Sequence, residues 1–409
     1  MFDRRRFLKT SSLVSLSAMV PQFVARTANA AAPGAENILV VVELSGGNDG
    51  LNTVVPHADD LYHKARPTLA IPKSRTLPLN ETIGLHPGLV SLHEMWKEGH
   101  LAVVQGVGYP NPDRSHFEAM DIWHSADPKR ATPTGWLGRA ASEGDNGSGG
   151  VPIVQIGGNK LPLAVVGAPG SGAVSIGQKN SFKLDLGAGG EAQLAKRRKF
   201  LDDLAKPGKD STDDLLGFVQ RRQVQTLTAV EQLRDLLEGP NAVRAFGTGL
   251  QQKLQLVAGL IERGFGTRIF YVNLDGFDTH SNQGPDHQKL MAELGDSIRS
   301  FFETLNRSKN EKRVRVLTFS EFGRRTQENN SRGTDHGAAS CLFVAGPSVK
   351  SAIVGEHPSL SDLDAGDLKH GLDFRRVYAT LLDGWLGCDS RAVLGAKWDS
   401  IPELAAKKA

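Results

Sequence analysis

Carboxylate and imidazole side chains gather in two short segments of the C-terminal half of this chain. The segment VRVLTFSEFGRR predicts a buried strand that ends at Glu321 and Arg324. The segment GTDHGAASCLFVAGP places Asp335 and His336 between glycines, directly before a second apolar strand. In open α/β sheets, ligands bind in the crevice beyond the carboxyl ends of the strands. Both segments therefore predict a site at one edge of a sheet.

Three further segments place polar side chains after a predicted strand. The strand ILVVVEL leads into SGGNDG, which carries Asp49, and TRIFYVNLDGFDTH ends with Asp278 and His280. Ser115 follows the strand LAVVQGVGY and begins a predicted helix, where free N–H groups and the helix dipole favour an anion. Structural roles remain open for each of them. Asp49 also fits an Asx turn, Ser115 also fits an N-cap whose capping box is closed by Glu118, and each histidine alone also fits a hydrogen-bonded structural position.

Together these residues form a set of carboxylates and imidazoles around one hydroxyl. Zinc and manganese accept histidine ligands, whereas magnesium and calcium prefer sites of oxygen atoms alone. Such a set suits metal-assisted ester hydrolysis, with Ser115 as the nucleophile. Arg324 or Arg325 would stabilise charge on a phosphoryl or sulfuryl group. The predicted divalent metal ligands or polar supports are Asp49, Asp278, His280, Glu321, Asp335 and His336.

The elements around these segments alternate between strands and helices. ILVVVEL has the composition of the first, central strand of a parallel sheet, and an amphipathic helix near residues 89–96 leads into the next strand. This alternation predicts an α/β fold with a mostly parallel central sheet and helices on both faces. Residues 191–264 change to a charged helical pattern, with apolar stripes in 212–238 and 250–261. They predict a helical insertion or cap.

The first thirty residues have the pattern of an export signal. The motif RRFLK lies ahead of a serine-diluted apolar stretch, which is too short to span a bilayer permanently and ends in Ala-Asn-Ala. The pattern predicts a twin-arginine signal peptide over residues 1–30 and one α/β domain over 31–409. A basic N-terminal helix is the alternative. We expect the twin-arginine export machinery as a partner, and a periplasmic or secreted protein that is exported folded.

Charge and cysteine content narrow the possible partners. Five basic side chains against Asp3 give the first thirty residues a net charge of +4, so the remainder of this +3 chain is near −1. That balance gives no general electrostatic reason to expect nucleic acid or an anionic membrane as a partner. Cys341 and Cys388 are too few for a disulfide framework. We expect buried free thiols, with a single disulfide as the alternative.

Nearly the whole chain resembles the domain-of-unknown-function 1501 family. The resemblance runs through ELSGGNDGLNTVVPH, RPTLAIP, PDRSHFEAMDIWHSA, GWLGR, DGFDTHSNQ, TFSEFGRR, GTDHGAAS and DFRRVYATLLDGWLG. That family looks like a branch of the alkaline phosphatase and sulfatase superfamily. The resemblance therefore implies a central mixed sheet flanked by helices, with a one- or two-metal hydrolytic site. It places Ser115 at the nucleophile position, and Asp278 and His280 at an Asp plus His metal pair.

The resemblance admits two alignments of the later segments. In the first alignment, TDHG matches the superfamily's Asp-His metal pair directly. In the second, TFSEFG occupies the strand that leads to this pair, and GTDHG matches a later histidine. We prefer the second alignment, because an apolar strand is expected before the Asp-His metal pair. In that alignment, Glu321 replaces the usual Asp-His. The resemblance implies an exported, metal-dependent hydrolase of a small phosphate or sulfate ester. The alternative is a non-catalytic exported binding or assembly protein that keeps the fold.

Overall fold

The structure is a computed structural model that describes residues 36–143, 151–158, 160–167, 173–177 and 249–405. The predicted signal peptide and the helix expected at 212–238 lie outside the described residues. The division of the chain into a signal and one domain therefore stays a prediction.

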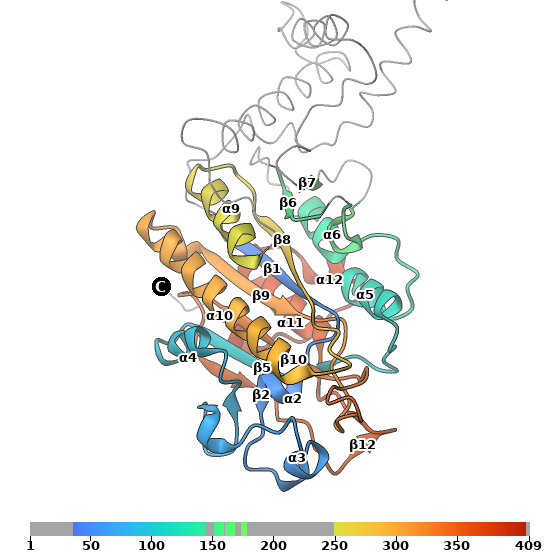
Figure 1. The fold of residues 1–409 in the computed structure, drawn as a ribbon. Coiled ribbons are helices and arrows are strands. Elements are labelled where there is room, and N and C mark those ends of the chain that lie inside the picture. The colour runs from blue at the N-terminus through green and yellow to red at the C-terminus, as the bar shows by residue number, and fades with distance from the viewer. Residues whose placement is uncertain (1–35, 144–150, 159, 168–172, 178–248, 406–409) are drawn as a thin grey trace, which may run out of the picture.

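A twisted central sheet forms the middle of the protein (Figure 1). Its strands follow the order β11-β5-β10-β9-β1-β8-β6-β7, and β14 pairs with β5. Strand β10 is antiparallel to both of its neighbours, and every other pair is parallel. The mostly parallel sheet is thus confirmed. The strands are β1 (Ile38–Ser45), β5 (Leu101–Gly108), β6 (Ile153–Ile156), β7 (Ala173–Ile176), β8 (Ile269–Asp275), β9 (Val314–Phe319), β10 (Ser340–Ala345), β11 (Ala352–Val354) and β14 (Leu372–Asp373).

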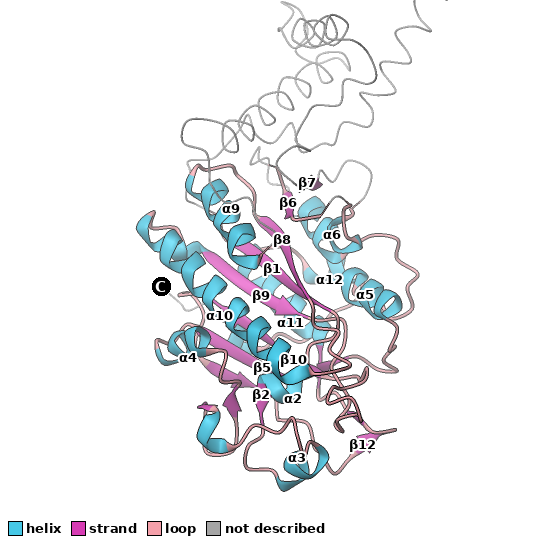
Figure 2. Ribbon diagram, viewed as in Figure 1, coloured by secondary structure: helices cyan, strands magenta, loops and turns pink. Residues whose placement is uncertain are grey.

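Helices cover both faces of this sheet (Figure 2). One face carries α4 (Val90–Lys97), α9 (Leu250–Glu262) and α10 (Gln283–Arg307), and the other carries α5 (His116–Ser125), α6 (Trp136–Glu143), α11 (Phe374–Leu381) and α12 (Ser390–Leu394). The predicted helices at 89–96 and 250–261 are confirmed as α4 and α9. Helix α9 lies at the C-terminal end of the insertion predicted at 191–264. Because α9 packs on the sheet, this end of the segment belongs to the helical layer that covers the sheet.

Shorter elements complete the described chain. Two small sheets lie outside the central one, β2-β4-β3 and β12-β13. Their strands are β2 (Val54–Val55), β3 (Leu77–Pro78), β4 (Gly84–Leu85), β12 (Leu363–Asp364) and β13 (Asp367–Leu368). The short helices are α2 (Gly50–Thr53), α3 (Asp60–Ala65), η3 (Lys73–Arg75), η4 (Leu163–Val165), η5 (Glu311–Arg313), η6 (Leu382–Leu386) and η7 (Pro402–Leu404).

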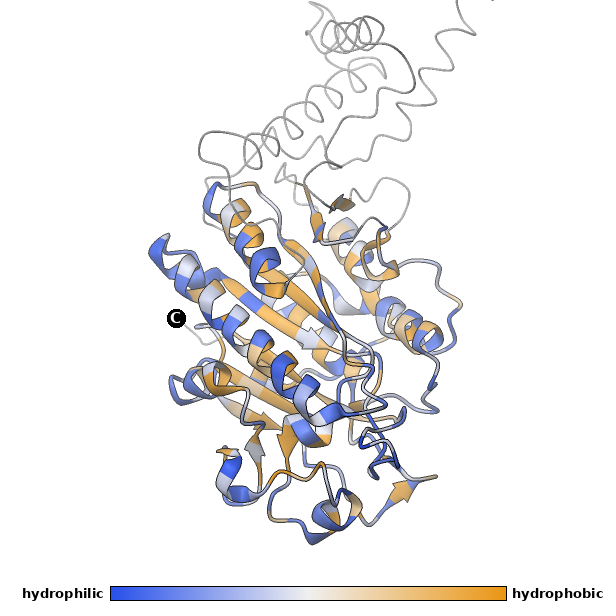
Figure 3. Cartoon of the chain, in the orientation of Figure 1, coloured by the Kyte–Doolittle hydropathy of each residue, from blue (hydrophilic) through white to orange (hydrophobic). Residues whose placement is uncertain are grey.

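The alternation of side chains along β1 explains why this strand is central. Ile38, Val40 and Val42 join the core under α4, α9 and α10, whereas Leu39 and Val41 join the core under α5 and α11. Both faces of a strand are buried when helices cover both sides of a parallel sheet, and this requires a continuous apolar run. Figure 3 shows the result, with apolar strands between helices whose outer faces are hydrophilic.

The reversed direction of strand β10 determines where the preceding segment GTDHG lies. Because β10 runs against β9 and β5, its first residue pairs with Val107 near the end of β5. Residues just before β10 therefore lie at the same edge as residues just after β1, β8 and β9. This is the edge at which the sequence predicts a site.

Two further expectations can be compared with the described residues. Cys341 and Cys388 are both buried and free, as expected. No helix in the described ranges combines the length and the apolar character needed to cross a membrane.

A buried ion pair holds the turn after β1. Asp49 caps α2 by accepting a hydrogen bond from Asn52 N, and its Oδ2 lies 2.6 Å from Nη1 of Arg66. The remaining Arg66 donors reach the carbonyl oxygens of Arg325 and Thr326 at 2.9 and 3.0 Å. Burial acts to raise the pKa of Asp49, but Arg66 outweighs it and holds the pKa below its usual range. The pair joins the turn after β1 to the segment after β9.

Replacing Arg66 by methionine should leave the Asp49 carboxylate buried without its cation. We expect the free energy of unfolding to fall by about 3–5 kcal/mol, measured by urea denaturation. The double variant Arg66→Met/Asp49→Asn should recover part of this loss, because it removes the uncompensated charge. A loss below about 1 kcal/mol in the single variant would contradict a structural role for the pair.

Candidate metal centre

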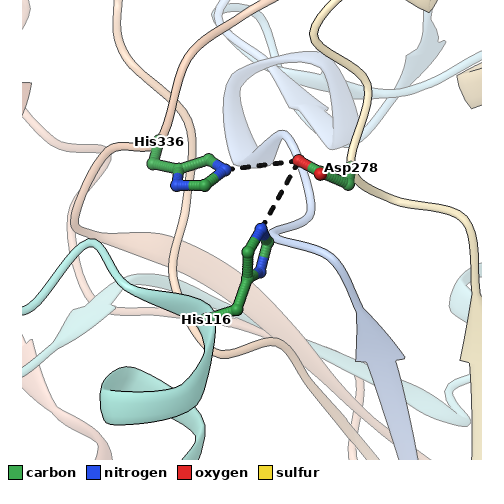
Figure 4. Close-up of side chains that lie close together, drawn as sticks. All are labelled: His116, Asp278 and His336. Atoms are coloured by element: carbon green, nitrogen blue, oxygen red, sulfur yellow. Dashed lines mark hydrogen bonds and ion pairs between the residues drawn. The ribbon is translucent and has the colours of Figure 1, made fainter.

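Three side chains from distant parts of the sequence meet at the carboxyl edge of the sheet. His116 is the first residue of α5, Asp278 follows β8, and His336 precedes β10. One ligand atom from each lies within 4.8 Å of the others. His116 Nε2 lies 3.6 Å from Asp278 Oδ1, and His336 Nε2 lies 3.3 Å from the same oxygen. Figure 4 shows both imidazole rings directed at this carboxylate.

His280 extends this cluster through contacts with two of its three residues. Its Nε2 lies 3.1 Å from Asp278 Oδ1 and 2.9 Å from His336 Nε2. Ligand atoms at 2.0–2.1 Å from a tetrahedral zinc ion lie about 3.3 Å from one another. The three separations to Asp278 Oδ1 and the one between His280 and His336 run from 2.9 to 3.6 Å, on both sides of that value. In donor type and in these separations, the cluster is compatible with zinc.

Backbone pairing brings the two histidine segments together. Thr334 N donates to Thr279 O at 3.3 Å, and Asn329 Nδ2 donates to His280 O at 2.9 Å. A Cβ atom at Gly333 would lie only 2.2 Å from the carbonyl carbon of His280. Residue 333 must therefore be glycine for His336 to reach His280.

Glu321 lies behind His116. Its Oε1 is 2.8 Å from His116 Nδ1 and accepts a hydrogen bond from Gly46 N at 2.8 Å, while Oε2 accepts one from Ser320 Oγ at 3.0 Å. The hydrogen bond to Glu321 raises the pKa of His116. A proton on Nδ1 leaves the Nε2 lone pair facing Asp278, which is the carboxylate–histidine–metal arrangement of many metal sites.

Asp335 supports His280 in a similar way. Its Oδ1 lies 3.2 Å from His280 Nδ1 and 3.1 Å from Asn329 Nδ2. The hydrogen bonds from Asn329 and His280 hold the pKa of Asp335 below its usual range. Two imidazoles of the cluster are thus oriented by carboxylates on the side away from Asp278.

The Arg324 side chain lies beneath the cluster and is fully buried. Its Nε donates to Gly47 O at 2.7 Å, Nη1 to Thr334 O at 2.7 Å, and Nη2 to Asp278 Oδ1 at 2.8 Å. Burial acts to raise the pKa of Asp278, but hydrogen bonds from Arg324 and His336 outweigh it, so the net pKa is lowered. Asp278 is therefore a carboxylate.

Ser115 occupies the N-cap position of α5, but its side chain makes no capping hydrogen bond. Its backbone N donates to Asp113 Oδ1 at 2.7 Å instead. The side chain is exposed, and among the described residues its hydroxyl has no hydrogen-bond partner. Ser115 therefore presents a free hydroxyl next to His116.

The structure brings some predicted site residues together and separates others. Asp278, His280 and His336 meet in the cluster, Glu321 and Asp335 lie behind its histidines, Arg324 lies beneath it, and Ser115 adjoins it. Asp49 lies apart, in the buried ion pair with Arg66. The catalytic and metal-binding roles of all eight residues stay predictions.

His116 is the cluster residue that the sequence analysis missed. It directly follows Ser115 in PDRSHF, so the signal was a histidine in the first turn of a helix beside a proposed nucleophile. Ser115 has extended backbone at the N-cap, and His116 is the first helical residue. Deciding which of the two neighbours points toward Asp278 requires the exact start of the helix, and helix ends predicted from sequence are uncertain by about two to four residues.

A mostly parallel sheet with histidines and carboxylates at its carboxyl edge defines an α/β protein with a candidate metal centre. The chain belongs to the family described as protein of unknown function (DUF1501), whose model matches residues 36–396. The resemblance seen in the sequence motifs is thus confirmed. No curated protein matches the chain.

Several solved structures are similar to the chain at low sequence identity. They include a protein in the alkaline phosphatase superfamily from Vibrio parahaemolyticus (TM-score 0.37, 8% identity, 93% of this chain and 75% of that chain covered). The PsFucS1 sulfatase from a Pseudoalteromonas species gives a TM-score of 0.38 at 11% identity, with 97% and 77% covered. The lipoteichoic acid synthase LtaP from Listeria monocytogenes gives 0.35 at 9% identity, with 75% and 64% covered, so this chain spans less than two thirds of the synthase. Similarity at this level carries no argument about activity or substrate.

Exchanging Glu321 for glutamine should weaken metal binding without removing a cluster ligand. The amide cannot stabilise a proton on His116 Nδ1 as a carboxylate does, so we expect a zinc dissociation constant about 10–100-fold higher. Competition against a chromogenic chelator measures it. Glu118→Gln, on helix α5 with His116 but without a contact to the cluster, should bind zinc as the unsubstituted protein does. Equal affinities for both variants would contradict the orienting role.

Proposed function

We propose that this protein is an exported, metal-dependent hydrolase that acts on a phosphate or sulfate ester. The observation that carries the proposal is the convergence of His116, Asp278 and His336 at one point of the sheet edge, with His280 in contact with Asp278 and His336. Three imidazoles and one carboxylate are a donor set suited to zinc or manganese, whereas calcium and magnesium favour oxygen ligands alone. The proposal of export is supported by the twin-arginine pattern of residues 1–30.

Ser115 is the proposed nucleophile. A metal ion held by the cluster would supply Lewis-acid stabilisation of charge on the ester and would favour the ionised serine oxygen. The Ser115 hydroxyl is exposed and free of hydrogen bonds to described residues, so it is available for attack. In the proposed reaction, the bond from Oγ to phosphorus or sulfur forms as the bond to the leaving oxygen breaks. Water then hydrolyses the serine ester.

The exposed Arg114 and the half-buried Arg325 are better placed than the buried Arg324 to bind the anionic oxygens of such an ester. The carbonyl of Arg114 lies 2.8 Å from His336 Nδ1, and the backbone N of Arg325 donates to Asp335 O at 3.0 Å. Both arginines thus extend from backbone that adjoins the cluster. Their guanidinium groups share a single carboxylate, Asp367, with Arg114 Nε 2.7 Å and Arg325 Nε 3.7 Å from its oxygens. Both guanidinium groups could therefore offer hydrogen-bond donors to the anionic oxygens of a substrate.

One observation favours the alternative function, a non-catalytic exported binding or assembly protein. Arg324 Nη2 lies 2.8 Å from Asp278 Oδ1, the oxygen toward which the histidines point. A cation of the protein itself already balances this carboxylate, so the cluster is held together without a metal ion. Measurement of bound metal and of turnover separates the two functions.

The test of the proposed function begins with elemental analysis of the purified protein. We expect zinc or manganese to be present, to be removed by chelation, and to restore hydrolysis of nitrophenyl phosphate or nitrophenyl sulfate when added back. His336→Ala should lose metal and turnover together, whereas His93→Ala, on α4 and outside the cluster, should keep both. An absence of bound metal and of turnover with any added divalent ion would exclude the hydrolase.

Ser115→Ala tests the nucleophile separately from the metal. We expect turnover to fall on the order of 10³-fold or more while metal content is unchanged, because the serine oxygen is replaced and no cluster ligand is touched. A trapped phosphoserine or sulfoserine, detected by mass spectrometry of quenched reactions, should be absent from this variant. Asp121→Asn, exposed on the same helix, is the matched control. Full activity of Ser115→Ala would remove Ser115 from the mechanism.

A further inference from the structure

A buried network of three polar residues ties helix α5 to the sheet. We call it the Glu43–His124–Tyr271 network, and its members are only 2–9% exposed. His124 Nε2 lies 3.0 Å from Glu43 Oε2 and 2.9 Å from Tyr271 Oη, and the Tyr271 hydroxyl also donates to Glu43. Glu43 is in β1 and Tyr271 in the neighbouring strand β8. One side chain of α5 thus spans two central strands.

The surroundings of Glu43 and Tyr271 favour a carboxylate beside a protonated phenol. Burial acts to raise the pKa of Glu43, but hydrogen bonds from His124 and Ser45 outweigh it and keep the pKa below its usual range. Burial and the neighbouring carboxylate raise the pKa of Tyr271 well above its usual value. Glu43 is therefore an acceptor and Tyr271 a donor. The bonds among the three side chains provide partners for Glu43 Oε2, Tyr271 Oη and His124 Nε2.

Helix α5 carries this network at one end and the candidate metal centre at the other. His116 and His124 are eight residues apart, which corresponds to about 12 Å along a helix. The first three residues of α5, His116 to Glu118, are not buried, and Phe117 is 83% exposed. Residues 122–125 are all buried. The place of His116 therefore depends on how the buried end of the helix is held, together with its own bond to Glu321.

Apolar packing alone does not set the orientation of this buried end. Trp123 stacks on Phe374 with ring centroids 4.4 Å apart and on Phe319 at 5.6 Å. Such burial is strong, and stacked rings still tolerate a range of offsets. Hydrogen bonds weaken steeply when their angles deviate. His124 can contact both partners only when this end of α5 lies directly over Glu43 and Tyr271.

We propose that Glu43, His124 and Tyr271 are positioning residues for the candidate metal centre, and that they hold α5 so that His116 Nε2 faces Asp278. The inference rests on the metal site of the proposed function. It concerns how that site is held in place, and it is independent of the ester that is hydrolysed.

The test compares Tyr271→Phe and His124→Leu with Ser125→Ala. Ser125 is as buried as His124 and adjacent to it, but its hydroxyl bonds to Asp121 O within the same helix. We expect zinc dissociation constants to rise about 10–100-fold in the two network variants and to be unchanged in Ser125→Ala. Tyr271→Phe removes only a hydroxyl group, so it gives an answer even where His124→Leu does not fold. Unchanged zinc affinity in the folded network variants would overturn the proposal.

A second measurement uses metal-free protein, so that failure of the proposed function can be distinguished from failure of this inference. In protein labelled with ¹⁵N-histidine, the Nδ1 proton of His116 bonded to Glu321 should give a downfield resonance. We expect this resonance to shift or disappear in Tyr271→Phe and to persist in Ser125→Ala. If the unsubstituted protein binds no metal, the proposed function fails, and this resonance alone decides the inference. An unperturbed resonance in Tyr271→Phe would then overturn it.

Discussion

The guanidinium of Arg324 is the constraint on which the candidate metal centre depends. It bonds to the carbonyls of Gly46 and Gly47 after β1, to Phe277 and Asp278 after β8, and to Thr334 before β10. Arg324 itself follows β9. A buried carbonyl without a donor is costly, and five N–H groups in one rigid plane can satisfy several carbonyls at once. Four loops that would otherwise be independent are therefore fixed relative to one another around a single cation.

The reversed direction of β10 gives this constraint its geometric setting. In a wholly parallel sheet, a segment that precedes a strand lies at the opposite edge from segments that follow strands. Because β10 is antiparallel, His336 arrives at the edge where Asp278 and Glu321 already lie. The short antiparallel bridge between Arg324 and His336 then aligns the two loops. Among the described strands of the central sheet, the single antiparallel one is thus the strand that completes the cluster.

Much of this architecture could be predicted from local sequence patterns. Continuous apolar runs predict strands buried on both faces, as in β1 and β9, and the 3.6-residue spacing of apolar side chains predicts helices such as α4 and α9. The rule that ligands bind beyond the carboxyl ends of strands gave the correct edge. These features depend on residues that are close together in the sequence, so they are visible without knowledge of the fold.

The detailed arrangement of the site depends on contacts between distant residues, and these were not predicted. From the sequence, Asp49 has the position of a metal ligand at the end of a strand. In the folded chain it lies next to Arg66, and the two form an ion pair. Glu321 fits the same description, and only the arrival of His116 from α5 shows that the carboxylate supports an imidazole. Glu43 and His124 were missed for the same reason. Each is a polar residue within a regular element, and its partner lies in another one.

The ligand atoms of the cluster come from segments that span more than half of the chain, from His116 to His336. No shorter piece of the chain contains them all, and none can bring them together before β10 has joined the sheet. A metal ion bound there would therefore be acquired only by a chain whose central sheet is complete. Its binding free energy would add directly to the stability of that finished state and to no earlier one. The fraction of chains with bound metal would then report the fraction in which these segments have folded together.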